Sequence, residues 1–391
     1  MGDLIISGRI LSFLSIISVG LSIYSIIRLL APEWKQGAWL GTTIFFAFNA
    51  TVFRGYVGMN DPQWLGHALM TGGLLLLLSH RDTGRIPAPI LLGSALLMVA
   101  GGLVKHNIIV TPAAVTLWLA VNDRKSCFLW LAVGITFVLF TIGLDKYAFN
   151  GNMMANVLGF PRQYYLWRMV EHGAVAILLL PLIIISWRII RIQAADRRLQ
   201  ILTLGCTFSV ILSIIQGSGA GVDINAYFEA LIFLSITVPV AISRCENLQA
   251  GKTLILLALP LVVLLPFGMF GLANEWQNRQ VDIAETRKII DAIAKVPGAV
   301  ACQTPALCYW AGKQFEMDFF YASQTLPKSP ELIHKALQGP LRLAAVEMTL
   351  PPNGGKFGPL EGLIAAQYRP YFFQENRPYL SQERRRLYAP R

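Results

Sequence analysis

Residues 37–80 read GAWLGTTIFFAFNATVFRGYVGMNDPQWLGHALMTGGLLLLLSH, two apolar runs separated by the polar patch RGYVGMNDPQ at residues 54–63. Each run approaches the roughly 20 residues that an α-helix needs to cross a bilayer. A charged pair such as Arg54 and Asp61 between two such runs is costly unless it faces water, a partner or a substrate. The stretch therefore predicts two membrane-spanning helices joined by a polar loop, which is the first place to look for function.

The rest of the chain repeats this pattern. Of its 391 residues, 54% are hydrophobic and only 14% are charged, whereas soluble domains carry about 25% charged residues. Apolar runs recur near residues 10–30, 37–56, 63–80, 87–105, 108–122, 127–145, 172–190, 201–217, 226–243 and 252–272. We therefore predict an α-helical polytopic membrane protein with about ten spans, one per run.

The net charge of +11 does not indicate nucleic-acid binding, because many basic residues lie in short loops, where they set orientation. Alternate loops hold the richer set: Arg28, Lys35, Arg81, Arg85, Arg124, Lys125, Arg188, Arg191, Arg197, Arg198, Arg244 and Lys252. By the positive-inside rule these loops face the cytoplasm. The loops with Asp61 and Lys105 then lie outside the cytoplasmic (inner) membrane.

This orientation places the N-terminus outside, with only residues 1–9 before the first apolar run. A natural chain more often supplies a leading helix in that situation. We therefore expect a preceding span and outer loop to be missing from this sequence; the alternative is a genuine protein with an outside N-terminus.

The composition changes after residue 273, so we divide the chain into a transmembrane domain, residues 1–273, and a tail, residues 274–391. The tail alternates expected helices (284–295, 307–312 and 331–337) with expected strands (298–302 and 341–348). This alternation predicts a small α/β domain, which an even number of spans places outside the cytoplasm. There Cys302 and Cys308 could pair or stay free.

Two polar clusters stand out in the first half of the chain. Arg54, Asn60 and Asp61 suit a substrate phosphate and carboxylate chemistry, although Asn60-Asp61-Pro62 would equally cap the next helix. Lys105 and His106 interrupt two apolar runs almost without a loop. Lys105 could meet a phosphate as a compact point charge, or reach the lipid headgroups from the helix end.

Two further clusters follow. Asn225, Tyr227 and Glu229 alternate after a glycine-rich segment, and Glu229 falls inside an apolar run, where a carboxylate is expensive. Tyr164 and Arg168 belong to an aromatic and basic loop that would form an interfacial belt or grip a lipid-linked phosphate or sugar. Each cluster also has a purely structural explanation, a flexible loop or ion pair for the first and the belt for the second. The sequence contains no phosphate-binding P-loop, GxSxG elbow or dinucleotide fingerprint.

The order of these motifs resembles a known group. Gly8-Arg9 near the start, Asn60-Asp61-Pro62, Lys105-His106-Asn107 and Asn225-Ala-Tyr-Phe-Glu229 are similar to motifs of integral-membrane glycosyltransferases with a GT-C fold. The likeness is to the family 39-like group, which includes protein mannosyltransferases and bacterial lipid A aminoarabinose transferases. It covers roughly residues 8–245.

The resemblance implies transfer of a sugar from a polyprenyl-phosphate-linked donor to a lipid, glycan or protein acceptor outside the membrane. Membrane lipid is an expected partner and nucleic acid is not. The implied catalytic residues are Asp61 and Glu229, and the implied substrate-binding residues are Arg54, Asn60, Lys105, His106, Tyr164, Arg168, Asn225 and Tyr227. No metal ligand is predicted, and a divalent metal cofactor is left open.

The same resemblance implies a catalytic acidic residue in a first outer loop, for which Asp3 would be a poor substitute here. The chain could then be a fragment, an inactive relative or a scaffold. A transporter or flippase of lipid-linked or small polar substrates is the other alternative.

Overall fold

A computed structural model describes residues 2–80, 85–154, 162–192, 196–244, 250–326, 331, 343–349, 359–373 and 385–390. Two compact units make up the chain. The first comprises Met1–Gly159 and Tyr164–Gly268, and the second comprises Phe160–Gln163 and Met269–Arg391. Each unit is described by itself.

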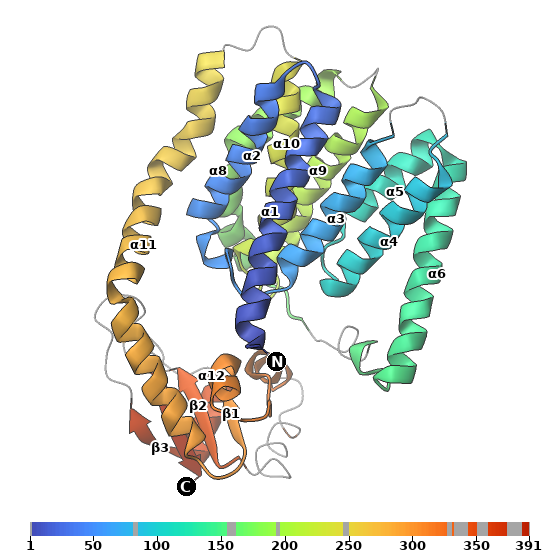
Figure 1. The fold of residues 1–391 in the computed structure, drawn as a ribbon. Coiled ribbons are helices and arrows are strands. Elements are labelled where there is room, and N and C mark those ends of the chain that lie inside the picture. The colour runs from blue at the N-terminus through green and yellow to red at the C-terminus, as the bar shows by residue number, and fades with distance from the viewer. Residues whose placement is uncertain are drawn as a thin grey trace. The chain divides into compact units, whose positions relative to one another are not determined.

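The first unit is a bundle of helices (Figure 1). Its helices are α1 (Leu4–Leu30), α2 (Lys35–Thr51), α3 (Gln63–Leu78), α4 (Ala88–Val104), α5 (Val110–Asn122), α6 (Arg124–Ala148), α8 (Leu166–Ile192), α9 (Arg197–Gly217), α10 (Phe228–Ser243) and the start of α11 (Ala250–Ala294). Two 3-10 turns, η1 (Arg54–Tyr56) and η3 (Ile224–Tyr227), accompany them. Each helix overlaps one predicted apolar run, which confirms the predicted fold class.

Several helices meet the requirements for a membrane span. Among the described residues, five segments are long and apolar enough: α1, α6, α9, Leu166–Trp187 of α8, and Ile224–Ser243, which joins η3 to α10. Helices α3, α4 and α5 are apolar but shorter. The protein is therefore a multi-pass membrane protein.

The core of the bundle surrounds α10. This helix is buried along almost its whole length and contacts α1, α2, α8 and α9. Helix α6, in contrast to α10, is largely exposed. It packs mainly on α4 and α5, and large apolar residues such as Phe128 and Phe140 lie on its exposed surface. An apolar helix that is exposed in this way is stable only against lipid.

Helices α3 and α4 pack closely, and this contact positions the polar residues described below. A Cβ atom at Gly101 of α4 would lie 2.9 Å from the carbonyl oxygen of Gly66 on α3. Small residues let helix backbones approach in this manner. Helix α3 begins just after Asp61 and α4 ends just before Lys105, so the contact brings the two charged residues to the same end of the bundle.

The second unit contains the remainder of α11 and a four-stranded sheet. Its further elements are β1 (Val300–Cys302), α12 (Pro305–Trp310), α13 (Phe319–Thr325), β2 (Ala345–Thr349), α15 (Pro359–Gln367), β3 (Tyr368–Phe373) and β4 (Arg385–Pro390). The strand order is β1-β2-β4-β3; β1 and β2 are parallel, and the other pairs are antiparallel. Ile289 and Ile293 of α11 pack on this sheet in one core with Val300 and Leu387.

The sequence anticipated part of this unit. The small α/β domain is present, and Cys302 and Cys308 form a disulfide between β1 and α12. The expected helix at 284–295 is the last part of the continuous helix α11, which also runs through the predicted boundary at residue 273. The expected helix at 331–337 lies outside the described residues except for Glu331.

Candidate functional site

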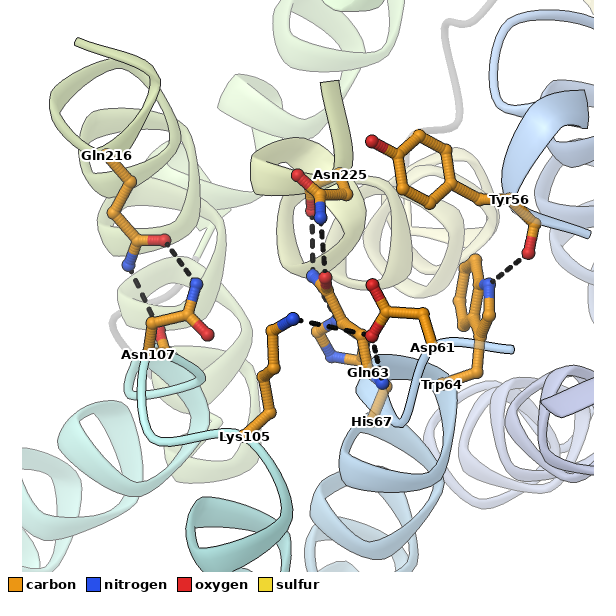
Figure 2. A network of polar contacts seen from close by, with 9 residues as sticks. All are labelled: Tyr56, Asp61, Gln63, Trp64, His67, Lys105, Asn107, Gln216 and Asn225. Atoms are coloured by element: carbon orange, nitrogen blue, oxygen red, sulfur yellow. Dashed lines mark hydrogen bonds and ion pairs between the residues drawn. The ribbon is translucent and has the colours of Figure 1, made fainter. Parts of the chain in front are cut away.

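Asp61 and Lys105 form an ion pair at the ends of α3 and α4. The Oδ1 atom of Asp61 lies 3.3 Å from the Nζ atom of Lys105, and it also accepts a hydrogen bond of 2.8 Å from the backbone N–H of Gln63 (Figure 2). The side chains of Lys105 and Asp61 are 29% and 20% exposed, respectively. The structure thus joins two clusters that are 44 residues apart in the sequence.

A pair of amide side chains supports one flank of this ion pair. Asn225 Nδ2 donates to Gln63 Oε1 at 2.8 Å, and Gln63 Nε2 donates to the carbonyl oxygen of Asn225 at 3.0 Å. The amide nitrogen of Gln63 also lies 3.4 Å from Nε2 of His67. Because these contacts join the start of α3 to η3, they fix the backbone that carries Asp61 (Figure 2).

A second amide pair supports the other flank. Gln216 Nε2 donates to the carbonyl oxygen of Asn107 at 3.0 Å, and Asn107 Nδ2 lies 3.4 Å from Gln216 Oε1. This pair holds the short α4–α5 connection against the end of α9 (Figure 2). Neither Gln63, Asn107 nor Gln216 was predicted as a site residue. The sequence feature that could have indicated them is the position of an amide side chain at the outer end of an apolar run.

The loop before Asp61 is fixed by aromatic residues. The hydroxyl of Tyr56 donates to Asp223 Oδ2 at 2.7 Å, and Trp64 Nε1 donates to the carbonyl oxygen of Tyr56 at 3.2 Å. The Trp64 ring stacks on Phe228 with 4.2 Å between centroids. Burial, together with the hydrogen bond to Asp223, raises the pKa of the Tyr56 phenol well above its usual value near 10.

Arg54 and Asn60 flank the same loop without contacting the ion pair. Arg54 Nη1 donates to the carbonyl oxygen of Gly268 at 3.1 Å. The exposed Asn60 side chain lies directly against Gly8 of α1, where an added Cβ atom would overlap it. The start of α1 therefore limits where this loop can move, and the predicted substrate contacts of Arg54 and Asn60 stay predictions.

Glu229 lies away from the surface, in the first turn of α10. Only 7% exposed, it accepts hydrogen bonds from the backbone N–H groups of Val110 (3.4 Å) and Thr111 (3.2 Å) and from the Thr111 hydroxyl (3.3 Å). These are the first residues of α5, whose amide groups have no partner within the helix. The geometry gives Glu229 a capping contact, and its predicted catalytic role stays a prediction.

Tyr227 is also a core residue. It is fully buried, its hydroxyl donates to the carbonyl oxygen of His172 at 2.6 Å, and its ring is nearly parallel to the His172 ring. A substrate would reach this side chain only after the core had opened. Tyr227 packs in the core, and its predicted substrate contact stays a prediction.

Tyr164 and Arg168 lie beside the segment before η3. Arg168 Nη2 donates to the carbonyl oxygen of Val222 at 2.7 Å, and its guanidinium carbon lies 5.7 Å from the Trp167 ring centroid. Tyr164 forms an isolated backbone bridge with Gly219, while its side chain is 62% exposed. Both residues thus hold the loop before α8, and their predicted substrate contacts stay predictions.

An apolar groove of about 480 Å³ lies between α4, α5 and α6. Its walls come mainly from residues 95–103 of α4, residues 108–116 at the start of α5 and residues 130–139 of α6, together with Met70 and His106. Leu139 in its wall is 62% exposed at the surface of the bundle. His106, which lines the groove, directly follows Lys105 in the chain.

A metal site finds no support in the described part of the chain. There, no three His, Cys, Asp or Glu side chains gather in a cluster that could hold an ion. Whether a divalent metal takes part stays open.

Comparison with known proteins places the fold. No protein-family profile and no curated protein sequence matches the chain. A crystal structure of ArnT from Cupriavidus metallidurans bound to undecaprenyl phosphate is similar, with a TM-score of 0.55 and 13% identity over 97% of this chain and 83% of that chain. The apo ArnT structure gives 0.52 and 12% over 96% and 83%. At identities this low, the similarity shows the fold and not the activity. The chain has the GT-C fold that the sequence motifs predicted.

Proposed function

We propose that the protein transfers a sugar from a polyprenyl-phosphate-linked donor to a hydroxyl group of a lipid, glycan or protein acceptor at the outer face of the membrane. The observation that carries this proposal is an apolar groove lined by His106, the residue that directly follows Lys105 in the chain. A long isoprenoid chain and a phosphate are the two parts of a ligand that such a site would hold.

The donor would bind through both parts. Burying isoprenoid carbons in the groove contributes about 25 cal/mol per Å² of apolar surface. Lys105 would meet the phosphate as a point charge, and His106 would line the entry. The binding of undecaprenyl phosphate by ArnT, a protein of the same fold, supports a polyprenyl phosphate as the ligand class.

The reaction needs one base and one stabilised leaving group. The acceptor oxygen attacks the anomeric carbon of the donor sugar while the bond from that carbon to the phosphate oxygen breaks, and polyprenyl phosphate leaves with the electron pair. Asp61 would take the acceptor proton, because it is a partly exposed carboxylate in contact with Lys105. Lys105 would stabilise the charge that develops on the leaving phosphate.

The other predicted residues have lesser roles in this proposal. Glu229 would position the start of α5, which forms a wall of the groove. Asn225 would hold Asp61 through Gln63. Arg54, Asn60, Tyr164 and Arg168 are candidates for contacts with the sugar or the acceptor.

Two observations support an outer location for the site and the second unit. Arg85, Arg124 and Arg244 lie at the helix ends opposite to Asp61 and Lys105, as the positive-inside rule requires. The disulfide of Cys302 and Cys308 is a feature of oxidising, extracytoplasmic compartments. Since the polar side chains gather at helix ends and not at the bilayer midplane, transfer is favoured over transport.

The experiment is a transfer assay with the full chain in lipid nanodiscs. Radiolabelled undecaprenyl-phosphate sugars are incubated with lipid, glycan and peptide acceptors, and label in the acceptor is counted. We expect Asp61→Asn to lower the rate at least about 100-fold, the usual contribution of a general base. Asp291→Asn, at an exposed carboxylate of α11, is the matched control. If no label reaches an acceptor in nanodiscs, and the chain reconstituted in vesicles moves the labelled lipid across their membrane, transport would replace transfer.

A further inference from the structure

We propose that Asp61 and the donor phosphate compete for the ammonium group of Lys105, so that binding of the donor releases Asp61 from its ion pair. This inference rests on the proposed function and adds an order to it. The carboxylate that would take the acceptor proton becomes free of Lys105 only when the donor is in place.

The two contacts of Asp61 differ in a way that permits this exchange. The backbone N–H of Gln63 donates to Oδ1 at 2.8 Å, a normal hydrogen-bond length, whereas Lys105 Nζ lies 3.3 Å from the same atom. Charge-assisted N–H···O bonds are usually about 2.7–2.9 Å long. The contact with Gln63 therefore holds Asp61 in position, and the contact with Lys105 is the looser of the two.

Lys105 has no second carboxylate to restrain it. Within the described residues, its ion pair is with Asp61 alone. The next carboxylate along the site, Asp223, receives the hydroxyl of Tyr56 and the backbone N–H of Ile224. A phosphate at the end of the groove therefore competes with a single carboxylate for Lys105.

The ion pair is half-buried, since the side chains of Lys105 and Asp61 are 29% and 20% exposed. Ion pairs at a fully exposed surface change an equilibrium constant by roughly two- to fivefold, which sets the order of magnitude for this one. A phosphate whose isoprenoid chain is already held in the groove can meet that cost.

Release of Lys105 would leave the carboxylate in place for the next step. Asp61 would keep its bond from Gln63, and Gln63 itself stays bound to Asn225. Figure 2 shows the second oxygen of Asp61 pointing away from both Lys105 and the Gln63 backbone. Because both printed contacts of Asp61 use Oδ1, Oδ2 would be the atom that takes the proton of an acceptor hydroxyl, so the same residue can lose a cation and gain a proton without moving.

Binding of undecaprenyl phosphate separates this competition from catalysis. Its dissociation constant is measured for the full chain in nanodiscs, for Asp61→Asn, Lys105→Met and the double variant, with undecaprenol as the uncharged control ligand. We expect Asp61→Asn to bind undecaprenyl phosphate about threefold more tightly, because the competing charge is gone. We expect Lys105→Met to bind it more weakly, the double variant to match Lys105→Met, and undecaprenol binding to stay constant.

Two other outcomes of these binding measurements would overturn the proposal. Unchanged or weaker binding by Asp61→Asn, with weaker binding by Lys105→Met, would overturn the competition and leave the phosphate contact intact. Equal binding by wild type and Lys105→Met would remove the phosphate contact itself and with it the donor site proposed above. Asp61→Ser, which also keeps an acceptor for the Gln63 amide, repeats the measurement in case the asparagine variant fails to fold.

Discussion

Replacement of Glu229 tests whether its buried contacts are structural. Glu229→Ala removes the acceptors of two backbone amides and one hydroxyl at the start of α5. Loss of a helix cap costs about 0.5–2 kcal/mol, and a buried donor without a partner costs about 1–3 kcal/mol. Because the first turn of α5 can relax, these costs do not add fully, and we expect the free energy of unfolding to fall by about 2–4 kcal/mol.

The conservative change Glu229→Gln sharpens the test. Its amide oxygen can still accept from Thr111, but its NH₂ group then faces the Val110 amide, so we expect a loss of about 1–2 kcal/mol. Unfolding is followed by denaturant titration in mixed micelles, with transfer of labelled sugar measured on the same samples below the transition. Wild-type stability in both variants together with abolished transfer would refute the capping role and restore the catalytic one.

Three further predictions concern the surroundings of the ion pair. Gln63→Leu removes both contacts with Asn225, and Asn225→Leu removes the contact between the two side chains. The two changes should show a coupling of about 1 kcal/mol in a double-mutant cycle on unfolding, whereas additive effects would mean that the side-chain contact contributes nothing. Because burial and Asp223 raise the pKa of Tyr56, ultraviolet titration should show that its phenol stays protonated well above pH 10. The stability that the protonated phenol contributes is present below pH 10 and is lost as the pH rises through the folded-state pKa. A Tyr56→Phe variant whose titration loses no tyrosine step at high pH would contradict this. Leu139→Trp, which fills the groove, should weaken undecaprenyl phosphate binding severalfold, while Phe128→Trp on an exposed part of α6 should not; equal effects would show that the groove is not the binding surface.

The helices and the placement of Asp61 and Lys105 at the same end of the bundle could be predicted from the sequence for one reason, whereas the ion pair between them could not. Apolar length determines where helices cross the membrane, and alternate polar junctions then collect on one face. Both residues lie at such junctions, beside helices that follow each other in the chain. No tertiary information was needed to bring them to the same end of the bundle.

The amide pairs and the role of Glu229 could not be predicted in this way. Gln63 and Asn225 are 162 residues apart, and either amide alone suits an exposed helix end. The cost of a buried carboxylate indicates that Glu229 has a partner, but a catalytic contact and a helix cap satisfy that cost equally well. Strands β3 and β4 were missed because Pro370 and the arginines at 385 and 386 are typical of loops and edge strands.

The distribution of tight and loose contacts around the site follows what a transferase would require. The backbone near Asp61 and Lys105 is held by reciprocal amide pairs on both flanks and by the close packing of α3 on α4. Such fixed surroundings keep reacting groups in position without a cost at the moment of reaction. The ion pair between them is a single contact of 3.3 Å through one carboxylate oxygen, so a phosphate would have to replace one contact and not a reciprocal pair.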